Sequence, residues 1–200
     1  MNFSSVNGKN WLFRKFNSSD VIKFAEVFSL TEIVAKLLSI RKKNIDDIGI
    51  FLDPKIKNLL PNPLNLKDMK NAIERTYKCI SNGELIGIFG DYDVDGASST
   101  ALLARYFLSI NQKIQTYIPD RHTEGYGPSV SGFKKLIDMG VKIIFTVDCG
   151  TLSFEPINFA KKLEADVIVL DHHQSDIKLP DACAIVNPNR YDDTSGLNSL

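Results

Sequence analysis

The chain has few cysteines, no long apolar run and no net charge, and each of these shortages excludes a class of protein. Its three cysteines, Cys79, Cys149 and Cys183, form no C-x-x-C pair and no even set, which excludes a disulfide framework and indicates reduced thiols. No apolar run is long enough to span a membrane, and the polar residues 1–9 are not typical of a signal peptide. We therefore expect a soluble, cytoplasmic protein that has no membrane partner.

The formal net charge of zero conceals an uneven distribution. Residues 1–82 contain 14 Lys and Arg against 8 Asp and Glu, whereas residues 83–200 contain 10 against 16. The basic front part suits a polyanionic partner and suits an ordinary solvated surface equally well. The acidic rear part suits bound cations.

The hydrophobic pattern changes near Gly83. Before it, helical spacing of apolar residues predicts short helices, separated by a proline-containing loop. After it, apolar strands are predicted at 85–89, 114–118, 142–147, 167–170 and 184–186, and helices at 97–110, 130–139 and 156–164. This alternation indicates a parallel sheet covered on both faces. We predict an α/β fold, a doubly wound and mainly parallel sheet over residues 84–200, with a small helical N-terminal segment over residues 1–83.

Three carboxylates, Asp91, Asp93 and Asp95, follow the first predicted strand within the segment 90–96. They would repel one another unless a cation lay among them, and hard divalent metals prefer oxygen ligands. The carboxyl end of a strand in an open α/β sheet is also where ligands bind. Taken alone, a solvated acidic turn explains the segment equally well.

Two later strands also end in residues that can bind metal. Asp148 follows the third predicted strand, and Asp171, His172 and His173 follow the fourth. Because the carboxyl ends of parallel strands share one edge, these side chains are expected to converge. Carboxylates with one or two imidazoles suit a pair of Mn²⁺ or Mg²⁺ ions. Zinc sites use sets of thiolates, so we interpret Cys149 as a small buried side chain.

Four motifs occur in an order that resembles the DHH phosphoesterase family, which is named after its Asp-His-His triplet. They are the segments 90–96, 124–127, 148–150 and 171–173. Trp11, the segment 51–54, Asp68-Met69 and Asn187-Pro188 also resemble the branch of this family that degrades single-stranded DNA. The resemblance covers nearly the whole chain.

The resemblance implies a catalytic set of five residues. Asp93 and Asp95 would each hold one metal ion, Asp148 would bridge the two, and His172 would be a further ligand. His173 would contact the scissile phosphate or orient its neighbours. Asp91 and Asp171 belong to the same motifs and are further candidate ligands, although a structural hydrogen-bonding role suits Asp91 equally well.

The resemblance also implies a substrate-binding set. Arg121, Glu124, Gly125, Tyr126 and Gly127 resemble the segment that approaches the nucleic-acid backbone, and Arg121 can hold a phosphate with two hydrogen bonds. We expect His122 to be an exposed loop residue and not a ligand.

Ser98 and Ser99 are expected near a helix start. There they would either bind phosphate or cap the helix. Both roles remain open from the sequence.

The implied function is hydrolysis of phosphodiester bonds with two divalent ions, releasing nucleotides from the 5′ end of single-stranded DNA in repair and recombination. Two departures qualify it. Phe89 stands where many family members carry a histidine ligand. A further metal-binding aspartate, a second C-terminal domain and an OB-fold do not fit before Leu200, so we expect weak activity and name a separately encoded C-terminal half as a candidate partner.

Two alternatives remain open. The first is a small-substrate DHH phosphoesterase that acts on short oligonucleotides, cyclic dinucleotides or pyrophosphate. The helical front part and the segment 124–127 count against it. The second is a DNA- or metal-binding remnant that no longer turns over.

Overall fold

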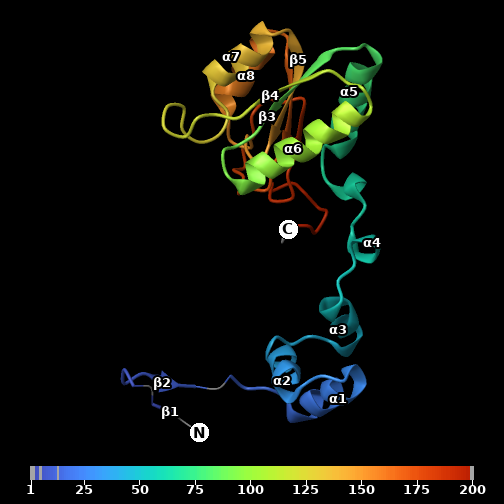
Figure 1. The fold of residues 1–200 in the computed structure, drawn as a ribbon, viewed down its shortest axis with the longest axis vertical. Helices are drawn as coiled ribbons and strands as arrows, with labels where there is room; N and C mark the ends of the chain where they lie inside the picture. Colours follow the sequence, from blue (N-terminus) through green and yellow to red (C-terminus); the bar gives the residue numbers. More distant parts are fainter. Residues whose placement is uncertain (1–2, 5, 13, 199–200) are drawn as a thin grey trace. The chain divides into compact units, whose positions relative to one another are not determined.

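The chain forms two compact units, which divide between Pro61 and Asn62 in a computed structural model (Figure 1). The model describes residues 3–4, 6–12 and 14–198. The sequence pattern put the division near Gly83 instead. The difference arises because helix α5 (Met69–Ser81) buries Ala72 and Cys79 in the core of the second unit.

The first unit, residues 1–61, is small and mainly helical. Strands β1 (Phe3–Ser4) and β2 (Asn10–Trp11) pair antiparallel, and four helices follow: α1 (Ser18–Phe28), α2 (Glu32–Ile40), α3 (Ile45–Leu52) and α4 (Ile56–Leu59). Asn17 caps α1, because its side chain accepts a hydrogen bond from the Ser19 amide. Val21 and Phe24 of α1 pack with Leu38 of α2 and Ile48 of α3.

The second unit, residues 62–200, contains the α/β domain that was predicted over residues 84–200. Its elements are η1 (Pro63–Asn65), α5, β3 (Leu85–Phe89), α6 (Val94–Ser109), β4 (Ile114–Tyr117), α7 (Val130–Asp138), β5 (Val141–Val147), α8 (Phe154–Lys162), β6 (Asp166–Leu170) and β7 (Ala184–Val186). The five strands are all parallel, in the order β4-β3-β5-β6-β7. No helix in the described part of the chain is both long and apolar enough to cross a membrane.

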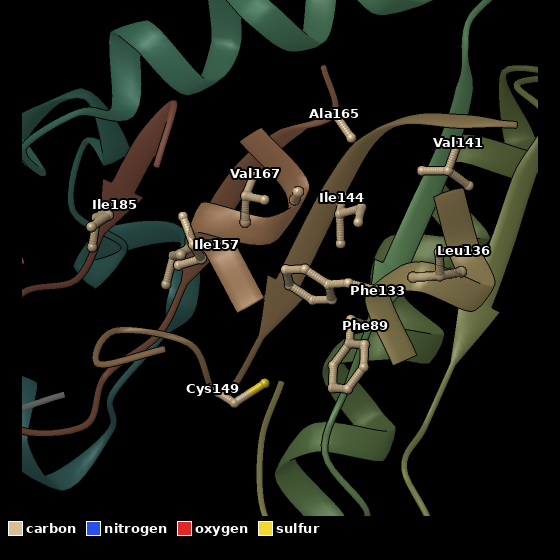
Figure 2. Packing of buried hydrophobic residues seen from close by; sticks show 12 residues of the cluster. Phe89, Phe133, Leu136, Val141, Ile144, Cys149, Ile157, Ala165, Val167 and Ile185 are labelled. Atoms are coloured by element: carbon tan, nitrogen blue, oxygen red, sulfur yellow. The ribbon is translucent and has the colours of Figure 1, made fainter. Parts of the chain in front are cut away.

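Helices cover both faces of this sheet, which confirms the doubly wound fold (Figure 1). On one face, Phe133 of α7 and Ile157 of α8 pack on Phe89, Ile144 and their strand neighbours (Figure 2). On the other face, α5 and α6 pack on a second cluster that contains Phe107 and Phe145. Full burial of one such side chain contributes roughly 1.5–3 kcal/mol. The inner strand β3 carries no polar side chain because both faces of the sheet are covered there, whereas the edge strand β4 contains Gln115 and Thr116.

The beginning and the end of the second unit are joined through one carboxylate. Asp68, just before α5, accepts hydrogen bonds from Arg190 Nη1 at 2.6 Å and from the Ile185 amide at 3.2 Å. Arg190 is 9% exposed and also pairs with Asp192 at 2.7 Å. The segment after β7 is thereby fixed to the rest of the domain.

Candidate active site

The loop between β3 and α6 brings Asp93 and Asp95 to the carboxyl edge of the sheet. Asp93 is the N-cap of α6, and its Oδ1 accepts a hydrogen bond from the Gly96 amide at 2.9 Å. Asp95 is exposed in the first turn of the helix. Both negative charges are favourable there because the helix dipole is positive at its N-terminus.

Asp91, in the same loop, is completely buried. Neither of its carboxylate oxygens has a hydrogen-bond partner among the described residues. The loop packs tightly, because a Cβ on Gly96 would lie 2.6 Å from the Asp91 nitrogen and one on Gly90 would overlap Thr100 Oγ1. The two glycines are therefore required for the close approach of this loop to α6.

Asp148 lies at the end of β5, in the left-handed backbone region with φ 61°. Its amide donates to the Leu170 carbonyl of β6 at 2.9 Å, and its side chain is 8% exposed. Asp148 Oδ1 lies 3.2 Å from His172 Nε2. Burial raises the pKa of Asp148, and the negative charge of Asp93 raises it further.

Asp171 and His173 form an ion pair after β6, with Oδ1 and Nδ1 2.7 Å apart. Burial opposes ionisation of Asp171, but hydrogen bonds from Thr151 and His173 outweigh it and lower its pKa. Burial also opposes the charge on His173, whose pKa is nevertheless raised by the hydrogen bond and charge of Asp171. The Tyr126 hydroxyl lies 3.2 Å from His173 Nε2 and 3.4 Å from the Asp148 carbonyl oxygen.

The structure brings together part of the predicted catalytic set. Asp148, His172 and His173 each offer one ligand atom, and these atoms lie within 4.8 Å of one another. They form the one such group of three or more His, Cys, Asp or Glu side chains in the part of the chain that the structure describes. Asp93 and Asp95 lie at the N-terminus of α6 and act on Asp148 through their charges.

Sequence reasoning gave no role to the residues that hold this group in place, although Asn187 belongs to one of the segments that carry the family resemblance. Asn187, which is buried after β7, donates from Nδ2 to Thr151 Oγ1 at 2.8 Å and to the His173 carbonyl at 2.9 Å. The Thr151 hydroxyl donates in turn to Asp171 Oδ2 at 2.6 Å. Asn189 donates from Nδ2 to the His172 carbonyl. The sequence could have indicated Asn187, because it directly follows the strand Ala184–Val186, just as Asp148 directly follows a predicted strand.

The segment 119–128 after β4 has mixed roles. Glu124 is 16% exposed in its side chain and accepts a hydrogen bond from the Tyr117 hydroxyl at 2.6 Å, with Lys135 3.7 Å away. These contacts hold Glu124 against β4, and its role near the nucleic-acid backbone stays a prediction. The Arg121 guanidinium lies over the Tyr92 ring at 5.3 Å, and Tyr126 is 56% exposed.

The remaining predicted positions differ in detail. Gly125 and Gly127 adopt positive φ angles of 79° and 75° in this segment. His122 is exposed, as expected. Because α6 begins at Val94, Ser98 and Ser99 lie in its second turn and Asp93 takes the capping position. The Ser99 hydroxyl donates to the Asp95 carbonyl at 2.7 Å.

The parallel sheet and the motifs at its carboxyl edge are features by which the chain can be compared with known protein families. Residues 85–199 match the DHH family, N-terminal domain. The chain belongs to the DHH family, which confirms the resemblance seen in the sequence.

Two similar proteins are single-stranded-DNA-specific exonucleases. The chain is 35% identical over 181 residues to the single-stranded-DNA-specific exonuclease RecJ of Bacillus subtilis, covering 90% of this chain and 23% of that protein. It is 39% identical over 140 residues to RecJ of Haemophilus influenzae, covering 69% and 24%. The chain thus spans about a quarter of the length of these relatives.

Solved structures agree. A crystal structure of exonuclease RecJ bound to manganese matches with a TM-score of 0.61 at 28% identity, over 66% of this chain and 34% of that one. RecJ from Thermus thermophilus in complex with Mn²⁺ matches with a TM-score of 0.70 at 21% identity, over 89% and 24%. The second match supports the fold alone.

Proposed function

We propose that this chain carries the catalytic DHH domain of an exonuclease that releases nucleotides from the 5′ end of single-stranded DNA, in DNA repair and recombination. The observation that carries the proposal is the convergence of ligand atoms from Asp148, His172 and His173 within 4.8 Å at the carboxyl edge of the sheet. The name of the Bacillus subtilis relative, similar over 90% of this chain, supports the substrate. The activity belongs in the cytoplasm, where free thiols stay reduced.

The residues at this edge fit divalent metal ions. An unpaired buried carboxylate such as Asp91 is costly unless a cation is near. Oxygen ligands with one or two imidazoles are the donor set that suits Mn²⁺ or Mg²⁺. The residues that would hold two such ions are Asp93, Asp95, Asp148 and His172, with Asp91 beside them. The related RecJ structure that contains manganese supports the choice of metal.

Divalent ions, when bound, supply Lewis-acid stabilisation of the charge on a phosphoryl group. The protein itself supplies orientation. His173 is held by Asp171 through its Nδ1, which leaves Nε2 directed to the Tyr126 hydroxyl and available to a phosphate oxygen. Its positive charge, favoured by Asp171, suits a phosphodiester.

Selectivity for single strands is supported by two aromatic rings beside the site, the exposed Tyr126 and the half-buried Tyr92. The Tyr92 and Tyr126 rings meet edge to face with centroids 6.5 Å apart, and Arg121 covers Tyr92. Unpaired bases stack on such rings, and arginine adds charge for the backbone, whereas a duplex keeps its bases stacked on one another.

The test is nucleotide release from 5′-labelled single-stranded DNA with Mn²⁺, comparing the wild type with Asp95→Ala. We expect release by the wild type that is lost in the variant, because Asp95 is one of the residues proposed to hold the metal ions. Duplex DNA, a cyclic dinucleotide and pyrophosphate serve as comparison substrates. Equal release by the two proteins, or faster turnover of the small substrates, would contradict the proposal.

A further inference from the structure

A cavity of about 290 Å³ lies beside the candidate active site. It is bounded by the segment 126–128 on one side and by the loop 150–153, between β5 and α8, on the other. Asp171 and His173 line it as well, so the cavity opens directly onto the histidine that the proposed function assigns to the phosphate. Nothing in the proposed chemistry of the metal site uses the remainder of this space.

The lining suits a flat and mostly uncharged group. Tyr126 is 56% exposed and Leu152 is 51% exposed, so each offers an apolar face. Gly127 and Gly150 have positive φ angles of 75° and 111°. Because they carry no side chain, the backbone of the cavity lining is accessible to a ligand at these two positions. Ser153 makes no side-chain hydrogen bond as the N-cap of α8, which leaves its hydroxyl for a ligand.

The same lining does not suit a phosphate. Among the ten residues that surround the cavity, none is a lysine or an arginine, and the charged ones are Asp171 and His173. Asp171 and His173 already pair with each other. A volume near 300 Å³ is at the small end of ligand sites, which fits one nucleoside better than a longer stretch of nucleic acid.

We propose that this cavity receives the base and sugar of the nucleotide whose phosphate lies at His173. Tyr126 and Leu152 would contact the base, since an aromatic ring stacks on any base, and Ser153 and Gln174 would supply polar contacts. The inference rests on the proposed function and extends it, because it assigns a nucleoside subsite that includes Leu152 and Ser153, which lie outside the four motifs.

The experiment measures binding of thymidine 5′-monophosphate and of inorganic phosphate to the 200-residue chain by calorimetry, with Mn²⁺ present. We expect the nucleotide to bind at least about tenfold more tightly than phosphate, because it buries its base against two apolar side chains. Leu152→Ala should reduce this preference about fivefold and leave phosphate affinity unchanged. Leu163→Ala is the matched control, because Leu163 is a similarly exposed leucine (44%) at the other end of α8.

The outcomes separate this proposal from the proposed function. Equal affinity for nucleotide and phosphate, or a preference that Leu152→Ala leaves intact, overturns the subsite even where single-stranded DNA is hydrolysed. A preference that Leu152→Ala weakens and Leu163→Ala preserves supports the subsite, even where hydrolysis of DNA fails. Leu152 is half exposed, so its truncation should leave the fold intact, which the melting temperature of each variant verifies.

Discussion

Replacing Asn187 with alanine removes hydrogen bonds that hold the backbone of both histidines of the candidate site, directly at His173 and through Asn189 at His172. The amide nitrogen donates to Thr151 Oγ1 and to the His173 carbonyl, and the amide oxygen accepts from the Asn189 amide at 2.7 Å. Asn189 in turn donates to the His172 carbonyl. One side chain therefore fixes the turn that carries the two imidazoles.

The cost can be worked from these contacts. Three hydrogen bonds are lost at a position that is 0% exposed, and each contributes roughly 1 kcal/mol net, so the expected destabilisation is about 3 kcal/mol. Partners left unsatisfied in the interior raise this figure. For a domain of this size the melting temperature should fall by about 10 °C.

The assay separates positioning from stability. Gln112→Ala is the matched control, because Gln112 is also a buried amide (7% exposed) and donates to the Glu84 carbonyl at 2.6 Å, at the opposite edge of the sheet. Both variants should melt at lower temperature than the wild type. The stabilisation produced by a fixed concentration of Mn²⁺ should persist in Gln112→Ala and largely disappear in Asn187→Ala, since a ligand stabilises the folded state by an amount that rises with the logarithm of its affinity. An equal Mn²⁺ effect in the two variants would refute the positioning role.

Three other predictions follow from the geometry of the second unit and of its loop. Gly96→Ala should lower the melting temperature and weaken Mn²⁺ binding, because the added Cβ meets loop backbone 2.5 Å away. Gly49→Ala changes another helical glycine, whose Cβ has 3.7 Å of clearance, and it should leave the melting temperature unchanged or raise it, because alanine favours a helix more than glycine does. A similar fall in both variants would contradict this reasoning. Burial raises the pKa of Asp148, and the charge of Asp93 raises it further, so folding favours the protonated carboxyl group. In the metal-free protein, Asp148 therefore contributes stability at pH values below its ordinary pKa. This contribution is lost as the pH rises through the raised pKa. Asp93→Asn should lower the pKa of Asp148 as followed by carboxyl NMR, and an unchanged value would contradict the coupling. Burial raises the pKa of Cys79 to about 11, so about one thiol in a thousand is ionised at pH 8. Iodoacetamide reacts with the thiolate, so it should label Cys79 after denaturation but not in the native protein.

The sheet could be predicted from the sequence because its signal is local. The strands Leu85–Phe89 and Ala184–Val186 have their predicted bounds, and the other three differ by one residue at an end. Mainly apolar runs between polar turns are sufficient for this, since strands buried on both faces are rich in apolar residues. Helix α6 begins three residues earlier than predicted because Asp93, read as a metal ligand, also caps the helix.

The parts that escaped prediction depend on contacts between distant segments. The hydrogen bond between Asn187 and Thr151 joins residues 36 positions apart, and the hydrophobic periodicity of the sequence does not predict it. Glu124 was expected near a substrate, but its partner Tyr117 becomes visible only once the loop after β4 folds back on the strand. The division at Pro61 likewise depends on α5 packing against a sheet whose strands come later in the chain.

The contact between Asp68 and Arg190 has a consequence for how the domain folds. It joins residues 122 positions apart, and the same carboxylate holds the amide of Ile185 in the last strand. Contacts of such long range slow folding, because the entropy of closing the chain is lost before the contact forms. During synthesis, Asp68 cannot form this ion pair until Arg190 has left the ribosome. Until then α5 and the early strands lack the edge strand β7, and part of their apolar surface is uncovered.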